Sequence, residues 1–263
     1  MITQVLVLLF ILFALLTLGF FIFLYWGTRW GSTTEERALE MPGDVYLEGG
    51  PKARVSMTRA ISIAASPQTV WPWLAQLGRG AGWYSIDWLD NGGRKSARHI
   101  ISWIPEPKIG DASPVGYLRH MEYNKALVWW VKGTKFVCAM TRLVVDMRLA
   151  PENKGSRLII RMSADAAGFT AKFALLIFQF IDFIMARSQL IGIRERVEHY
   201  GLRAKNPDEP ETGATDQYQL YEVIYVTGER AGVPGKELAV RWRQTAIEDG
   251  LIADSLTFDR GEQ

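Results

Sequence analysis

Residues 172–200 constrain the fold more than any other part of the chain, because their apolar side chains recur with the period of an α-helix. One stripe of the helical wheel consists of Phe173, Ile177, Phe180, Ile181, Ile184, Ser188 and Ile191. A helix of this length needs another apolar surface to pack against. The pattern therefore predicts one long amphipathic helix that lies over a sheet.

The first half of this helix is apolar on almost every side, so a membrane-spanning alternative has to be weighed. Its thirteen Leu, Ile, Phe and Met residues within 173–193 would gain roughly 4 to 8 kcal/mol on insertion into a bilayer. Asp182 and Arg187 would return about 5 to 7 kcal/mol. Because two glutamines add a further cost, the balance favours a helix packed on a sheet. Contact of this helix with the bilayer surface stays open.

The N-terminal segment is the second long apolar run. Residues 5–26 are 22 residues interrupted only by Thr17, which is enough to cross a bilayer as a helix. A cleaved signal peptide normally starts with basic residues, whereas the first basic residue here is Arg29. We therefore predict a single-pass transmembrane anchor at 1–28. Arg29 and Arg37 favour a cytoplasmic globular domain.

Composition excludes several classes of partner. With 263 residues, 48% of them hydrophobic, the chain can bury a sizeable core. A net charge of +2 gives no reason to expect nucleic acid as a partner. The single cysteine, Cys138, cannot form a disulfide within the chain. The three histidines have no close metal-ligand spacing, so no metal and no cofactor is predicted.

Between the two long helices, the pattern changes to short elements. Residues 54–63 alternate apolar and polar side chains, which predicts a half-buried strand. Ser66 and Pro67 are typical of a helix start, and this helix should run to Gly78. Short helical pieces are predicted at 85–89 and 97–103. Strands separated by turn signals, and therefore antiparallel, are predicted at 116–122, 127–131, 136–149 and 157–165.

These elements suggest five segments. After the anchor at 1–28, a linker is predicted at 29–53 because it mixes Gly, Pro, Thr and acidic residues without a period. The globular domain is predicted at 54–203, and an acidic linker at 204–216. Residues 217–263 form a C-terminal extension that is too small for a core of its own, so it should dock on the domain or bind a protein partner.

Four stretches, taken in this order, carry a family resemblance: RAISIAASPQTVWPWLAQLG, GWYSIDWLDN, MTRLVVDMRL and DFIMARSQLIGIRERVEHY. Residues 54–203 thus resemble the START-like superfamily, also called SRPBCC, which includes polyketide cyclases, dehydrases and lipid-transfer proteins. Within it, the chain is similar to a membrane-anchored bacterial branch. The resemblance implies an α+β helix-grip fold, in which a bent antiparallel sheet grips the long C-terminal helix around an elongated apolar cavity.

The leading functional hypothesis is a membrane-anchored protein that binds, and in one version transfers, a hydrophobic small molecule or lipid. Seven of the ten tryptophans lie within 71–130, and rigid aromatic rings often line ligand sites. The alternative is that these side chains simply fill the core. The predicted ligand-binding residues are Trp83, Tyr84, Trp88, Trp130, Ile177, Phe180, Ile181 and Ile184.

Two further hypotheses belong to other classes. An enzyme of the cyclase or dehydrase kind would use His120, Asp87 or Tyr84 as its acid or base, and one of them would have to reach the cavity. No general catalytic motif of the superfamily carries over to this chain, so binding is favoured over catalysis. An interaction module would instead recruit a protein partner through residues 217–263.

Overall fold

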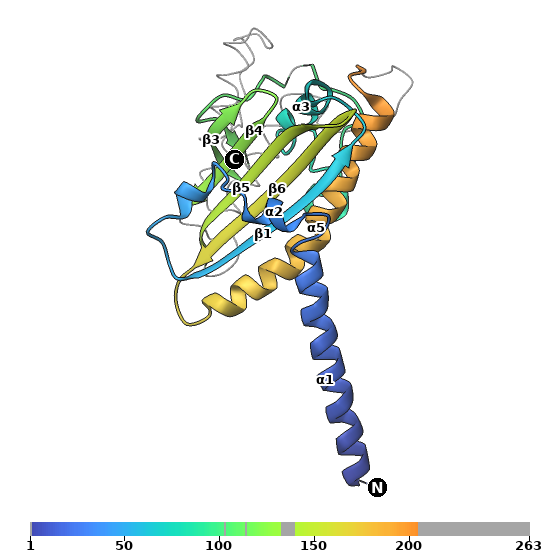
Figure 1. The fold of residues 1–263 in the computed structure, drawn as a ribbon, viewed down its shortest axis with the longest axis vertical. Coiled ribbons are helices and arrows are strands. Elements are labelled where there is room, and N and C mark those ends of the chain that lie inside the picture. The colour runs from blue at the N-terminus through green and yellow to red at the C-terminus, as the bar shows by residue number, and fades with distance from the viewer. Residues whose placement is uncertain (1, 103, 114, 133–139, 205–263) are drawn as a thin grey trace, which may run out of the picture.

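The computed structural model describes all residues except 1, 103, 114, 133–139 and 205–263. A bent antiparallel sheet is crossed on one face by a long helix, and a second long helix projects away from the domain (Figure 1). The helices are α1 (Ile2–Gly27), α2 (Thr34–Ala38), η1 (Asp44–Leu47), α3 (Pro67–Ala75), α4 (Asp87–Asp90) and α5 (Ala171–Tyr200). The strands are β1 (Ala53–Ile63), β2 (Ala112–Ser113), β3 (Gly116–Glu122), β4 (Ala126–Lys132), β5 (Met140–Glu152) and β6 (Gly155–Ala166).

The six strands form one sheet in the order β1-β6-β5-β4-β3-β2, with every neighbouring pair antiparallel. This confirms the predicted run of antiparallel hairpins. β1 pairs with β6 along its whole length, from Ala53 opposite Ala166 to Ile63 opposite Ser156. Consequently the first strand of the domain lies beside the last, as expected for a sheet that wraps a closing helix. The two-residue strand β2 is too short to produce a sequence pattern.

Local capping residues in the sequence account for the start of α3, but the sequence pattern does not account for the structure of residues 97–102. Ser66 caps α3, since its hydroxyl accepts a hydrogen bond from the Thr69 backbone N–H, and Pro67 occupies the first turn. The helical piece predicted at 97–103 is wrong for the described residues 97–102. There the Ala97 N–H donates to the Ala81 carbonyl at 2.8 Å, and the Ile101 N–H donates to Gln76 Oε1 at 2.9 Å. These backbone groups therefore bond to α3 and the loop after it.

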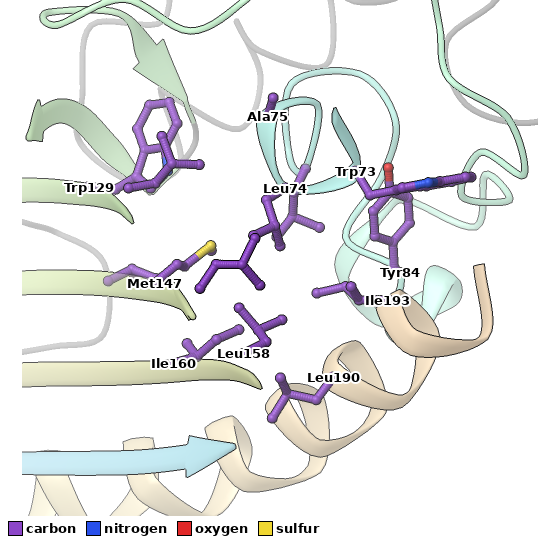
Figure 2. Close-up of a cluster of buried hydrophobic side chains, with 14 of the residues drawn as sticks. Trp73, Leu74, Ala75, Tyr84, Trp129, Met147, Leu158, Ile160, Leu190 and Ile193 are labelled. Carbon is purple, nitrogen blue, oxygen red and sulfur yellow. The ribbon is translucent and has the colours of Figure 1, made fainter. Parts of the chain in front are cut away.

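The sheet and the C-terminal half of α5 enclose a packed core. Figure 2 shows Leu190 and Ile193 of α5 beside Leu158 and Ile160 of β6, with α3 side chains closing the end. Leu158, Leu190 and Ile193 have no measurable exposure. This close packing fixes the C-terminal part of α5, from Leu190 onward, against the sheet.

The predicted stripe of α5 lies on the side of the helix that faces away from the sheet. Phe173, Ile177 and Ile184 are 66%, 40% and 39% exposed. The buried side consists instead of Ala171, Ala174, Leu175, Phe178, Asp182, Phe183, Ala186, Leu190, Gly192, Ile193 and Val197. At 100° per residue, the centres of the two sets are roughly 180° apart. The expectation that this stripe faces the sheet is therefore wrong.

Residues 29–52, which we call the strap, lie across the outer face of the sheet (Figure 1). Arg161 of β6 fixes the strap by donating hydrogen bonds to the backbone carbonyls of Glu36, Arg37 and Leu39 and to the Asp44 carboxylate, at 2.8 to 3.2 Å. The segment predicted as a linker at 29–53 is thus bonded to the sheet over much of its length. Its charged side chains resembled a solvated linker because their partners lie more than 100 residues away.

A buried junction joins α1 to the domain. Arg59 of β1, which is 1% exposed, donates from Nε to the carbonyl of Gly27 at 2.8 Å and lies 2.6 Å from the Asp182 carboxylate through Nη1. The ring of Phe183 packs at 4.5 Å from that of Phe23. A side chain at Gly27 would collide with the Phe183 ring. The last turn of α1 is therefore fixed to both β1 and α5.

Two described helices are long and apolar enough to cross a membrane. None of the apolar window of α1 is buried, whereas 39% of that of α5 is buried inside the domain. The helix α5 is thus part of the folded domain, as predicted. Cys138 and the residues 217–263, with the acidic linker before them, lie outside the described residues apart from the start of that linker at Ala204.

Candidate ligand-binding cavity

A cavity of about 300 Å³ lies between the middle of α5, residues 178–189, and the inner face of the sheet. This volume is at the lower limit of typical small-molecule sites. Its wall is predominantly apolar. The lining residues are Trp83, Ser85, Leu89, Asp90, Val115, Leu143, Val145, Met147, Met162, Phe178, Ile181, Asp182, Met185, Ala186 and Gln189.

Strand alternation and helix spacing explain why this space is lined as it is. Leu143, Val145 and Met147 are alternate residues of β5, so all three point to the same face of the sheet. On the opposite wall, positions 178, 182 and 186 share one face of α5, and the last of them carries only the methyl group of Ala186. The small residue leaves room where a longer side chain would fill the space.

Four polar side chains interrupt the apolar wall, and three of them are already engaged within the protein. The Ser85 hydroxyl donates to the Met185 carbonyl at 2.9 Å. The Gln189 amide donates to the Trp83 carbonyl at 3.1 Å. The third, the Asp182 carboxylate, forms the ion pair with buried Arg59. The fourth is Asp90, at the end of α4.

Asp90 is a partly buried carboxyl group whose two oxygens are inaccessible to solvent. Neither oxygen has a partner of hydrogen-bond geometry among the residues that the structure describes. Burial raises the pKa of Asp90 to about 6, although the nearby Ser85 hydroxyl partly offsets this rise. The charge of Asp87 on the same short helix raises the pKa further. A carboxyl group with this pKa is present in both forms near pH 6, and its protonated form both donates and accepts hydrogen bonds, whereas the ionised form only accepts them.

Of the eight predicted ligand-binding residues, the structure brings Trp83 and Ile181 to the cavity wall. Binding by these two stays a prediction. Ile177 and Ile184 are exposed on the far side of α5. Phe180 lies beside α1, with its ring 5.8 Å from that of Phe20. The prediction that these three residues line the cavity is wrong, because the side of α5 that faces the sheet is the one opposite to the predicted stripe.

The loop residues beside Trp83 have structural roles. Tyr84 is 1% exposed and accepts a hydrogen bond from the Gln76 amide at 2.7 Å, so its hydroxyl faces the packed core (Figure 2). The Asp87 carboxylate accepts from the Ser96 hydroxyl at 2.5 Å. Trp88 is 76% exposed. Neither Asp87 nor Trp88 lines the cavity, so of the residues singled out in this loop only Trp83 does.

His120 and Trp130 lie on the opposite face of the sheet from the cavity. His120 is opposite Val128 of β4, which packs under the strap against Leu47, and its ring lies 3.2 Å from the Glu122 carboxylate. Trp130 follows inward-facing Trp129, so strand alternation directs it outward, where its ring packs near Tyr46. All three proposed acid–base residues, His120, Asp87 and Tyr84, are thus outside the cavity wall.

Sequence reasoning missed most of the wall, including Asp90. The sequence of β5 shows the alternation of a strand, but it does not show which face of the strand lies toward α5. That depends on the strap, which covers the other face of the sheet. Asp90 follows Asp87 by three residues in DWLDN, and nothing in that spacing distinguishes the unbonded carboxyl from the bonded one. Within the described part of the chain, no group of His, Cys, Asp or Glu side chains could hold a metal ion.

Comparisons with known proteins give matches at the level of structure only. No protein-family model and no curated protein matches the chain. Among solved structures, Ara h 8.0201 matches with 11% identity and a TM-score of 0.34, covering 55% of this chain and 98% of its own. The AHSA1-like protein RHE_CH02687 from Rhizobium etli matches with 15% identity and a TM-score of 0.32, covering 61% and 93%.

A third match, the conserved protein of unknown function EF2215 from Enterococcus faecalis, has 13% identity and a TM-score of 0.31, covering 77% of this chain and 90% of its own. At these identities and TM-scores, the matches say nothing about what this chain binds. The fold follows from the strand order, the register and the closing helix. On that topology, together with the sequence stretches that resemble the superfamily, the chain has a START-like helix-grip fold.

Proposed function

We propose that this protein is held at a membrane by α1 and binds a hydrophobic small molecule or lipid in the cavity beneath α5. The observation that carries this proposal is the apolar cavity itself. It lies in the interior of a domain whose other buried side chains pack closely together. A purely structural core of this kind would be filled. Folding alone does not account for an unfilled apolar cavity, which supports a role in ligand binding.

The surroundings of the cavity support a membrane source for the ligand. Ile181 lines the cavity and is also 43% exposed, so the cavity borders the exterior at the outward side of α5. The same side carries exposed Phe173 and Ile177, and the first half of α5 crosses the end of the domain from which α1 emerges (Figure 1). Anchoring there raises the effective concentration of a lipid ligand at its binding site. Arg29 and Arg37 favour a cytoplasmic domain.

The experiment is to purify the full-length protein from its membrane and identify co-purifying apolar molecules by mass spectrometry. We expect one predominant apolar species at close to one molecule per chain. Ala186→Trp places a large ring in the cavity and should remove most of that species. Ile184→Trp adds the same ring on the exposed side of the same helix and should leave it unchanged. A wild-type protein that carries no more apolar material than Ala186→Trp would contradict the proposal.

A further inference from the structure

The polar groups of the cavity differ in whether they are free to contact a ligand. Ser85, Gln189 and Asp182 each bond to another part of the protein at 3.1 Å or less. Both oxygens of Asp90 lack such a bond within the described residues, and both are inaccessible to solvent. An unsatisfied buried carboxyl group costs folding free energy, so a native structure that keeps one usually has a use for it.

The position of Asp90 suggests that use. It lies on α4, next to Leu89 and close to Trp83, at the end of the cavity formed by the loop after α3. The opposite walls are the apolar side chains of β5 and α5. An elongated apolar molecule in the cavity would thus have hydrocarbon neighbours along most of its length and one carboxyl group at the loop end.

We propose that Asp90 recognises the polar end of the ligand, and that this ligand is a neutral, mostly hydrocarbon molecule that ends in a hydroxyl group. This inference rests on the proposed function, because it names the class of molecule that the cavity takes. A hydroxyl group donates a hydrogen bond to an ionised carboxylate and accepts one from a protonated carboxyl group. It therefore satisfies Asp90 in either state.

Charge excludes the commonest alternative, an anionic amphiphile. A carboxylate or phosphate end group at the loop end of the cavity would meet the carboxylate of Asp90, whereas the Asp182 carboxylate is already paired with Arg59. The neighbouring cation, Arg59, is already occupied by Asp182 and by the carbonyl of Gly27. Like charges brought together at a binding site cost several kcal/mol. Fatty acids and phospholipid head groups therefore fit this end of the cavity poorly.

The volume limits the length of the molecule. At roughly 30 Å³ for each non-hydrogen atom, the share that a water molecule takes in the liquid, a cavity of about 300 Å³ holds about ten such atoms. A straight-chain alcohol of about ten carbons is thus a suitable probe. A longer chain would extend past Ile181 to the exterior of the domain.

The test uses two photoreactive probes with the same ten-carbon, diazirine-bearing chain, one ending in a hydroxyl group and the other in a carboxylate. Full-length protein in lipid nanodiscs is photolabelled at pH 7.5, and labelling of the cavity segments 143–147 and 178–189 is quantified by mass spectrometry. Labelling of α1 in the same sample serves as the internal standard, because it reports how much of each probe has entered the bilayer.

After this normalisation, we expect the wild-type cavity to prefer the alcohol by at least roughly tenfold. Asp90→Asn keeps the shape and the hydrogen-bonding capacity but removes the charge, so the two probes should label within about twofold of each other. Glu195→Gln removes an exposed charge elsewhere on α5 and should keep the wild-type preference. That pattern would support the role of Asp90.

Two other outcomes would overturn the inference, and they differ in what they leave standing. If both probes label the wild-type cavity equally, or if Asp90→Asn keeps the preference, Asp90 does not read the end group, whereas binding in the cavity stands. If neither probe labels the cavity segments above the level seen in Ala186→Trp, the cavity does not take such molecules, and the proposed function fails together with this inference.

Discussion

Single residues decide which side of each element meets the interior. Asp182 counts as polar on a helical wheel, yet it is 5% exposed because Arg59 of β1 faces it with the opposite charge. Buried ion pairs of this kind are invisible to periodicity, since the partner lies in another element. Once Asp182 is placed inside, the exposed positions of Phe173, Ile177 and Ile184 follow from the geometry of the helix.

The charge of Asp90 makes the stability of the domain depend on pH. The pKa of about 6 in the folded protein lies above the ordinary value of 3.8, so the folded state holds the proton more tightly than the unfolded state. Stability therefore falls as pH rises from about 4 through about 6. The charged group that acts on Asp90 is Asp87 on its own helix, whereas Asp182, which lines the same cavity, is paired with Arg59.

Asp90→Asn removes this cost, because the amide does not ionise. At pH 7.5 we expect the variant to be more stable than the wild type by about 1 kcal/mol, a value reduced for the partial exposure of the group. At pH 4 the two proteins should unfold alike. Thermal unfolding of both proteins across this pH range checks the prediction, and a difference that does not change with pH would contradict it.

Regular elements were predictable from sequence, whereas their docking was not. The strands at 116–122 and 157–165 and the helix at 172–200 lie within two residues of β3, β6 and α5, because each has a clear local period. The strap lacks such a period. Its place is set by arginines of β6, Arg157 and Arg161, whose partners in the strap cannot be identified from spacing. The residues of the cavity wall could not be predicted for the same reason, because they depend on how the strap and α5 dock on the sheet.

The strap should bind the sheet less tightly when the hydrogen bonds from Arg161 are removed. Arg161→Gln deletes the guanidinium that bonds to three strap carbonyls and to Asp44. We expect amide hydrogen exchange of α2 and η1 to become at least roughly tenfold faster, while the amides of β5 and β6 keep their protection. Arg94→Gln changes an exposed arginine in the loop after α4 and should have no effect. Unchanged exchange in Arg161→Gln would contradict the prediction and would mean that the other bonds to the strap, such as those from Arg157 and Arg142, suffice to hold it.

At the scale of the whole molecule, α1 and the first half of α5 define one apolar end. Phe169 and Phe173, just before and at the start of α5, are exposed, and further along the helix Phe180 packs against Phe20 of the helix that we propose as the anchor. Soluble proteins rarely expose several large apolar side chains together unless they contact a membrane or a partner. The exposed side of α5 should therefore lie in the interfacial region of the bilayer, with the packed half of the domain pointing away from it.

Spin labels can measure this placement. Ile177→Cys and, as the control, Glu195→Cys are labelled in full-length protein in which Cys138, the single cysteine, is replaced by serine. In nanodiscs, the label at 177 should be more accessible to oxygen than to a water-soluble nickel relaxant, and the label at 195 should show the opposite order. A label at 177 that is water-accessible would place α5 clear of the membrane and would separate the cavity from the lipid phase.

The junction at Gly27 fixes the end of α1, the proposed anchor, to the domain. A helix that is longer than the local hydrocarbon thickness tilts, and the tilt changes with the thickness of the bilayer. The Gly27 carbonyl is bonded to Arg59, and Arg59 is paired with Asp182, so a tilt of the proposed anchor would be passed to α5, the helix that covers the cavity. We therefore expect membranes of different thickness to load this protein with ligand to different extents.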